Sequence, residues 1–191
     1  MKKLILLLLF IPLVSCQDVE VRKTYYESGE LQATVNIVNS KLQGEKRQGE
    51  YKGYWESGEL QGTANYVDGL RQGELKEYYE SGELDGTVNY VDGLIQGEWK
   101  GYYKSGELQY TVNYVDGLKN GEYKFYWESG ELKRTENYVD DLRQGEYKEY
   151  ESGGLLSTGN YVDDLRQGEW KWYYKSGELL STGNYVDGVK Q

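Results

Sequence analysis

From residue 25 onward, apolar and polar residues alternate in runs of six to eight, and short turn motifs separate the runs. One pair of runs covers 98–103 and 108–115, with a turn at 104–107 between them and a second turn at 116–120 after them. A period of two is typical of strands, and turn signals every dozen residues favour antiparallel hairpins. Beyond the first fifteen residues, no run follows a helical period.

The hairpin pattern recurs as a unit of about 24 residues, seven times in all, with one insertion near residue 45 and one deleted residue near 151. Two strands in each unit predict about fourteen strands in one elongated antiparallel meander, an all-β fold in which neighbouring hairpins stabilise each other. Equivalent residues should stack in rows that form an apolar face. The rows are Tyr66, Tyr90, Tyr114, Tyr138, Tyr161 and Tyr185; Leu31, Leu60, Leu84, Leu108, Leu132, Leu155 and Leu179; and Trp99, Tyr123, Tyr147 and Trp170.

The first residues have the pattern of an export signal. Lys2 and Lys3 precede the apolar stretch 4–13, which is too short to span a bilayer comfortably. The following segment, Leu13-Val14-Ser15-Cys16, resembles the lipobox of bacterial lipoproteins, in which the chain is cut before the cysteine and the cysteine is acylated. Cys16 is the single cysteine of the chain, so no disulfide within the chain is available to it. An ordinary secretory signal with an incidental cysteine is the alternative.

These features divide the chain into three parts. Residues 1–15 are predicted to be a lipoprotein signal peptide, 16–24 an anchor linker and capping segment, and 25–191 seven repeats. The predicted location is the cell envelope, with the chain anchored in a membrane by lipid at Cys16; in a Gram-negative cell this is the outer membrane or the surface.

The repeat resembles a known family. Its last complete copy places glycine at 168, 177, 183 and 188, and aromatic residues at 170, 173, 174 and 185. This pattern is similar to the bacterial variant of the MORN repeat and covers nearly all of the chain after the signal. The resemblance implies an elongated antiparallel sheet used for protein binding or scaffolding. Bacterial relatives of this variant are often labelled antitoxins or immunity proteins, and eukaryotic relatives have been linked to membranes and lipids.

Composition argues against catalysis. The chain has no histidine, which removes the commonest general base and metal ligand. Ser-Gly-Glu recurs in nearly every unit, whereas a nucleophile needs one pocket and one base. Carboxylate pairs are abundant but repeated, so solvated charge explains them better than a glycosidase pair. We therefore predict that the protein is not an enzyme and has no cofactor.

Charge limits the partners. The net charge of −10 disfavours nucleic acid and anionic lipid headgroups and would attract a cationic surface. A row of aspartates recurs at one edge of the predicted sheet and raises the question of calcium, but Asp-Gly is also an ordinary turn pair, and we predict no metal site. The row is Asp68, Asp92, Asp116, Asp140, Asp163 and Asp187.

A second aromatic row is the candidate binding face, because it should lie opposite Trp99 and beside lysines. It consists of Tyr54, Tyr78, Tyr102, Tyr126, Tyr150 and Tyr173. The alternative is that these tyrosines only form cross-strand pairs. The favoured function is a membrane-anchored protein-binding or scaffold module, including one of the immunity or antitoxin type. The second hypothesis is a structural or adhesion lipoprotein that binds glycan. Edge-to-edge self-association is a further expectation, because open strands invite pairing.

Overall fold

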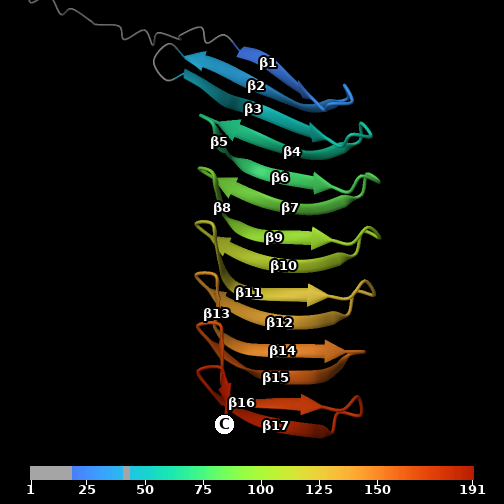
Figure 1. Ribbon diagram of the computed structural model, residues 1–191, viewed down its shortest axis with the longest axis vertical. Coiled ribbons are helices and arrows are strands. Elements are labelled where there is room, and N and C mark those ends of the chain that lie inside the picture. The colour runs from blue at the N-terminus through green and yellow to red at the C-terminus, as the bar shows by residue number, and fades with distance from the viewer. Residues whose placement is uncertain (1–18, 41–43) are drawn as a thin grey trace, which may run out of the picture.

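The computed structural model describes residues 19–40 and 44–191, and these form one open antiparallel sheet in which each long strand pairs with the long strands before and after it (Figure 1). The signal segment, Cys16 and residues 41–43 lie outside the described residues. The strands are β1 (Val19–Tyr25), β2 (Leu31–Ser40), β3 (Gly44–Tyr54), β4 (Leu60–Val67), β5 (Leu70–Arg71), β6 (Gly73–Tyr78), β7 (Leu84–Val91), β8 (Leu94–Ile95), β9 (Gly97–Tyr102), β10 (Leu108–Val115), β11 (Leu118–Tyr126), β12 (Leu132–Val139), β13 (Leu142–Arg143), β14 (Gly145–Glu151), β15 (Gly154–Val162), β16 (Leu165–Tyr173), β17 (Leu179–Val186) and β18 (Val189–Lys190).

The all-β meander predicted from the sequence is confirmed, but the described residues contain 18 strands instead of about fourteen. The four additional strands, β5, β8, β13 and β18, have two residues each. Each of them follows an Asp-Gly or Asp-Asp turn and pairs with the end of the preceding long strand. In β11 and β16 the corresponding residues continue without a break into the long strand, so the higher number reflects short interruptions within the same hairpins.

The Asp-Gly turns are shorter than predicted. We expected a turn over 116–120, but β11 already begins at Leu118 and only Asp116 and Gly117 form the turn. Both residues have positive φ, at 51° and 85°. This is the geometry of a two-residue turn whose twist matches that of the flanking strands, and glycine and aspartate adopt it at low cost. Such turns lie along one side of the column of hairpins, and the Ser-Gly turns lie along the other (Figure 1).

The core is a layer of aromatic rings on one face of the sheet. Trp99 lies 5.9 Å from Tyr114 and Tyr147 lies 5.8 Å from Tyr161, measured between ring centroids. Ring pairs at this separation add about 0.5–1.5 kcal/mol each beyond the area that they bury. The predicted first-strand row and the Tyr66 row therefore interlock, and they cover the buried Val88 and Val112. A single-layer sheet obtains its core because large side chains on one face cover small ones.

The segment predicted as a cap contributes a complete strand. β1 begins at Val19 and pairs with β2 from Val19 to Tyr25. Its Val19 and Val21 side chains are largely exposed. Fewer apolar side chains are therefore buried at this end of the described sheet.

Candidate functional site

The six tyrosines proposed as a binding face end the first long strand of each hairpin, or come one residue before its end in β14, and all six are half-buried. In each strand the residue two positions before the tyrosine is a lysine, and a glutamate precedes the lysine by two more. Alternate residues share a face, so Glu98, Lys100 and Tyr102 lie on the side opposite Trp99. The structure thus places the row on the face expected from the sequence.

The lysines of this face are already ion-paired. Each lysine Nζ lies 2.8–3.1 Å from the glutamate two residues earlier, in six equivalent pairs. The side chains stay partly exposed, and such pairs contribute only about 0–1 kcal/mol each. The pairs are Glu50–Lys52, Glu74–Lys76, Glu98–Lys100, Glu122–Lys124, Glu146–Lys148 and Glu169–Lys171. The face is therefore polar and internally balanced in charge, which leaves it little unsatisfied attraction for a charged partner.

Hydrogen bonds to the backbone carbonyls of the tyrosine row connect one repeat to the next. The Tyr79 hydroxyl donates a hydrogen bond to the Tyr102 carbonyl at 2.6 Å, and Tyr103 does the same to Tyr126 at 2.7 Å. These donors could not be predicted from the alternation along the chain, because the two residues in each contact are 23 positions apart. The donors that follow this pattern are Tyr26, Trp55, Tyr79 and Tyr103.

The deleted residue near 151 coincides with the end of this series. Within the described chain, the Trp127 indole N–H has no such bond to the next repeat, and the Trp127 side chain is 37% exposed. Lys133 Nζ lies 3.7 Å from the Trp127 ring centroid instead. A cation over an exposed indole contributes about 0.5–1 kcal/mol. The shortened repeat thus leaves an aromatic side chain accessible on the Ser-Gly side of the sheet.

A pocket opens in the aromatic layer beside Gly62, which occupies the position that Tyr110 has two repeats later. Its lining includes Tyr51, Trp55, Leu75, Glu77 and Asp85. The combination of rings and carboxylates would suit a cation, but Arg71 already brings a positive charge to its lining.

The Asp-Gly turns form a regular edge with a second system of ties between repeats. A glutamine from the preceding repeat accepts a hydrogen bond from the aspartate backbone N–H, as Gln72 Oε1 does from Asp92 at 2.8 Å. The turn glycine also donates to a backbone carbonyl of that repeat, as Gly93 does to Arg71 at 2.9 Å. Five turns have the glutamine bond, at Asp68, Asp92, Asp116, Asp163 and Asp187. Among residues 19–40 and 44–191, no group of three or more side chains is arranged to hold a metal ion.

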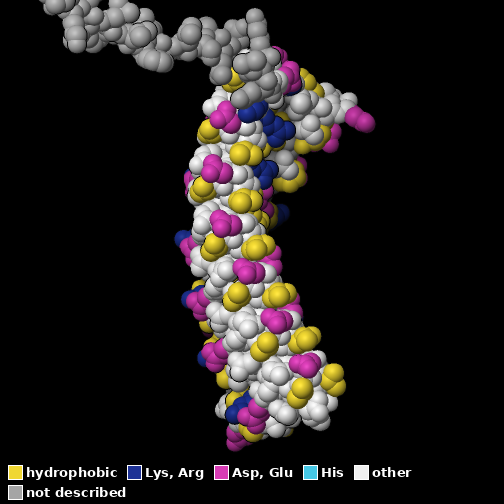
Figure 2. Space-filling view, turned by 90° about the vertical axis from the view of Figure 1, so that its left-hand side faces the viewer, with side chains coloured by type: hydrophobic (Ala, Val, Ile, Leu, Met, Phe, Trp, Pro, Cys, Tyr) yellow, Lys and Arg dark blue, Asp and Glu magenta, His cyan; other side chains and the backbone are white. Residues whose placement is uncertain are grey.

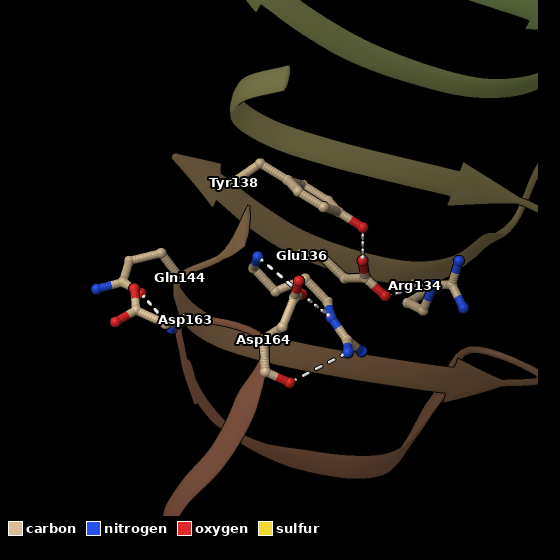
Figure 3. Close-up of polar contacts among 7 residues, drawn as sticks. Arg134, Glu136, Tyr138, Gln144, Asp163 and Asp164 are labelled. Carbon is tan, nitrogen blue, oxygen red and sulfur yellow. Dashed lines mark hydrogen bonds and ion pairs between the residues drawn. The ribbon is translucent and has the colours of Figure 1, made fainter. Parts of the chain in front are cut away.

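Two of these turns have aspartate in place of the glycine. Asp141 and Asp164 have φ of 70° and 67°, which is unusual for a residue with a side chain. Each carboxylate accepts a backbone N–H from the preceding repeat: Asp141 from Lys119 at 2.8 Å, and Asp164 from Arg143 at 3.0 Å. Figure 3 shows Asp164 together with the Asp163–Gln144 bond of the same turn. The Arg143 guanidinium also holds the pKa of Asp164 below its usual value. The aspartates therefore offset their strain with hydrogen bonds that glycine would lack.

The residues that flank these turns form the most exposed apolar row in the described chain. Each turn has a valine before it and a leucine or valine after it, and their exposed fractions range from 41% to 64%. Figure 2 shows apolar side chains recurring along this side of the molecule, with acidic side chains and backbone between them. We call this row the Val–Leu edge; it comprises Val67, Leu70, Val91, Leu94, Val115, Leu118, Val139, Leu142, Val162, Leu165, Val186 and Val189.

The Val–Leu edge is continuous because the repeats contact each other through it. The Leu70 Cδ2 lies 3.2 Å from the position that a Cβ on Gly93 would occupy, and Leu94 and Leu165 approach Gly117 and Gly188 in the same way. These three leucines therefore rest on the backbone of the next turn while their other sides face solvent. We did not identify this edge from the sequence, although the recurring Val-Asp-Gly-Leu motif is the signal that could have revealed it.

Buried tyrosines should make the sheet less stable at alkaline pH. Burial raises the pKa of Tyr110 and Tyr147 to about 12. The pKa of an unfolded tyrosine is about 10, so this contribution to stability is fully present below pH 10 and is lost as pH rises toward 12. We expect the free energy of unfolding to fall between pH 9 and pH 11.5 in urea titrations, and less steeply in Tyr110→Phe/Tyr147→Phe. An equal slope in both proteins would contradict this assignment, because the surface lysines titrate in both.

Comparison with known proteins identifies the repeat. A family model described as the MORN repeat variant matches six segments, which together make up more than half of the chain: 21–39, 47–68, 71–92, 95–116, 119–140 and 166–187. The unit with the deleted residue falls between the last two matches. No curated protein matches the chain.

Solved structures show only distant similarity. The crystal structure of the GtfA/B complex bound to UDP and GlcNAc is 15% identical, with a TM-score of 0.25 over 65% of this chain and 22% of the other. A porin-like protein from Bacteroides uniformis ATCC 8492 is 10% identical, with a TM-score of 0.24 over 91% of this chain and 92% of the other.

Proposed function

The chain belongs to the MORN repeat variant family, and on this premise we propose that it is a protein-binding or scaffold module held at a membrane by a lipid anchor. The observation that carries the proposal is the Val–Leu edge. Its side chains remain 41–64% exposed in every repeat from Val67 to Val189. Two strand spacings of about 4.8 Å set the repeats about 10 Å apart, so six turns form a strip of about 50–60 Å.

Singly scattered apolar side chains are normal on a protein surface, but here two exposed apolar side chains recur at every turn from Val67 to Val189. An ordered repetition of this kind is typical of an interaction site. The internal ties along the edge keep the strip in one arrangement, so a partner would not need to order it on binding. A preformed linear surface of this kind suits a scaffold. The proposal assigns no catalysis to the chain, since its reactive groups recur in repeats and it has no histidine.

The proposed anchor is Cys16, acylated after removal of residues 1–15. No helix in the part of the chain that the structure describes is long and apolar enough to cross a membrane. Stable attachment through acyl chains requires two or more of them, which lipoprotein processing would supply.

Replacing Cys16 with Ala should therefore abolish acylation and move the protein from the membrane fraction to the soluble fraction. Metabolic labelling with a clickable palmitate analogue, followed by fractionation, measures both effects. Cys16→Ser serves as a second variant with the same expected outcome. Unchanged membrane fractionation of both variants would show that the lipobox assignment is wrong.

Affinity capture tests the binding function. Captures with the wild-type chain and with Leu94→Glu/Leu118→Glu should differ in one stoichiometric protein, whereas Glu98→Gln/Lys100→Gln should retain it. An immunity-type role would identify that protein as a toxin in a one-to-one complex. The glycan-binding alternative instead places the site on the face of Lys100 and Tyr102. It predicts that the wild-type chain binds a glycan array and that Leu94→Glu/Leu118→Glu binds it equally well. A capture without any stoichiometric protein would contradict the module proposal.

A further inference from the structure

We infer that the Val–Leu edge seats a cationic amphipathic α-helix of the partner, with one heptad of the helix against each repeat. This inference deepens the binding function proposed above and rests on it. Three properties of the edge support it: its period, the two apolar side chains that each repeat contributes, and its uncompensated acidic charge.

The period of the edge fits a helix. Successive turns stand about 10 Å apart, because each repeat adds two strands at about 4.8 Å. Seven residues of an α-helix rise about 10.5 Å. An added strand repeats its side chains on one face about every 6.7 Å and would fall out of step within two repeats. Helix and edge differ by only about 0.5–1 Å per repeat, so about three heptads stay in register.

The number of apolar side chains distinguishes a helix from a polyproline segment. A polyproline II turn also rises about 9.3 Å, but its partners are aromatic-lined grooves. Each repeat of the edge offers two aliphatic side chains instead, such as Val91 and Leu94, and both flank one turn. Two contacts in every heptad correspond to the a and d positions of an amphipathic helix. The edge is also narrow, since only one valine and one leucine span its width in each repeat.

The negative charge of the edge indicates that the partner surface is positively charged. An aspartate lies between the valine and the leucine of every turn, and all six of these aspartates are exposed. Within the described part of the chain, no ion pair involves Asp92, Asp116 or Asp163, whose backbone N–H groups rather than carboxylates bond the glutamines. Carboxylates without counter-ions favour lysine or arginine beside the apolar stripe of the helix.

The same charge argues against two other occupants. A second copy of this chain would bring another aspartate row against the first, and its net charge of −10 would add repulsion. An anionic membrane surface would be repelled by the aspartates for the same reason. A cationic helix is the occupant that satisfies both the apolar row and the acidic row.

A designed peptide tests this inference on the full-length chain. The probe has three heptads with leucine at a and d and lysine at the flanking positions, and it carries a fluorescent label. The controls are a scrambled peptide of equal composition and a peptide with glutamate in place of lysine. Fluorescence anisotropy should show binding of the first peptide at micromolar concentration, and binding of both controls should be at least ten-fold weaker.

Variants of the protein locate the contact. Leu94→Glu/Leu118→Glu should weaken binding at least ten-fold, and Asp92→Asn/Asp116→Asn should weaken it several-fold and reduce its dependence on salt. Asparagine tolerates the positive φ of these positions, so the second variant keeps the turns. The control Glu98→Gln/Lys100→Gln removes one ion pair but leaves the net charge and every valine, leucine and aspartate of the edge unchanged, and it should bind like the wild type.

The outcomes separate this inference from the general function. Equal binding of the scrambled peptide, or unchanged binding by both edge variants, would overturn the helix assignment. If the edge variants lose the captured cellular protein but the designed helix does not bind, the module stands and the helix assignment is wrong. If a captured protein depends only on the Lys100 face, the edge is not the site and the inference fails.

Discussion

Trp170→Ala is expected to lower the free energy of unfolding by about 3–5 kcal/mol, the range seen when a buried aromatic side chain is truncated. Trp170 is only 1% exposed, and other rings of the aromatic layer surround it. Its ring centroid is 5.3 Å from that of Tyr147 and 5.1 Å from that of Tyr161, and its indole N–H donates to the Asn160 carbonyl at 3.2 Å. The side chain therefore joins the final repeats to the shortened one.

The space for Trp170 depends on a glycine opposite. A Cβ on Gly159 would lie 2.2 Å from Trp170 Cδ2, closer than real side chains approach. Two units before it, Val112 faces Tyr123 at the equivalent positions. Gly159→Val should therefore destabilise the sheet through overpacking, and Trp170→Tyr through loss of volume. The double variant Trp170→Tyr/Gly159→Val transplants the Val112–Tyr123 pair and should recover most of the loss.

Urea unfolding followed by circular dichroism measures these changes, and hydrogen exchange of residues 165–191 reports whether the terminal repeat detaches first. Repeat proteins unfold through neighbouring units, so we expect this segment to lose protection before 84–115 does. Leu180→Ala, at a largely exposed position of the same repeat, is the matched control and should cost less than about 1 kcal/mol. A Trp170→Ala protein as stable as this control would refute the packing argument.

Glu136→Val is expected to lower the free energy of unfolding by about 2 kcal/mol, although valine is apolar and the two preceding repeats have it at the equivalent position, as Val88 and Val112. The Glu136 side chain is 5% exposed, and Glu136 accepts a hydrogen bond from the Tyr138 hydroxyl at 2.6 Å (Figure 3). Its other oxygen lies 3.0 Å from Arg134 Nε in an ion pair whose geometry is not that of a hydrogen bond. Removing the carboxylate would leave a guanidinium and a hydroxyl without their partner.

The expected loss in the free energy of unfolding is small for a buried ion pair, because the Arg134 side chain is 38% exposed and water screens its charge. Arg134→Tyr/Glu136→Val restores the Tyr110–Val112 combination of the preceding repeat, and it should be as stable as the wild type or more so, because buried ion pairs rarely exceed well-packed apolar groups in stability. Thermal and urea unfolding of the single and double variants measure this difference. A double variant as unstable as Glu136→Val would show that the local backbone, and not the charge pair, sets the cost.

Much of the architecture follows from the sequence because it depends on neighbours along the chain. The period of two sets which side chains share a face, so the Trp99 and Tyr114 rows interlock as predicted. Asp-Gly pairs favour two-residue turns. The predicted turn over 116–120 was too long, because strand pairing already resumes at Leu118. The long hairpins were predicted correctly, and the extra short strands arise from interruptions that alternation does not encode.

The candidate site divides in the same way. The sequence by itself determined the repeat, the faces of its strands and the row from Tyr54 to Tyr173. Only the tertiary structure decided that this face is internally ion-paired and that the Val–Leu edge is the open apolar surface. Side-chain exposure depends on how closely the next repeat approaches. Leu70 contacts the turn at Gly93, which lies 23 residues further on and covers only one side of it. The distance between turns follows from the strand spacing and the backbone bonds between repeats, and no residue within a single repeat encodes it.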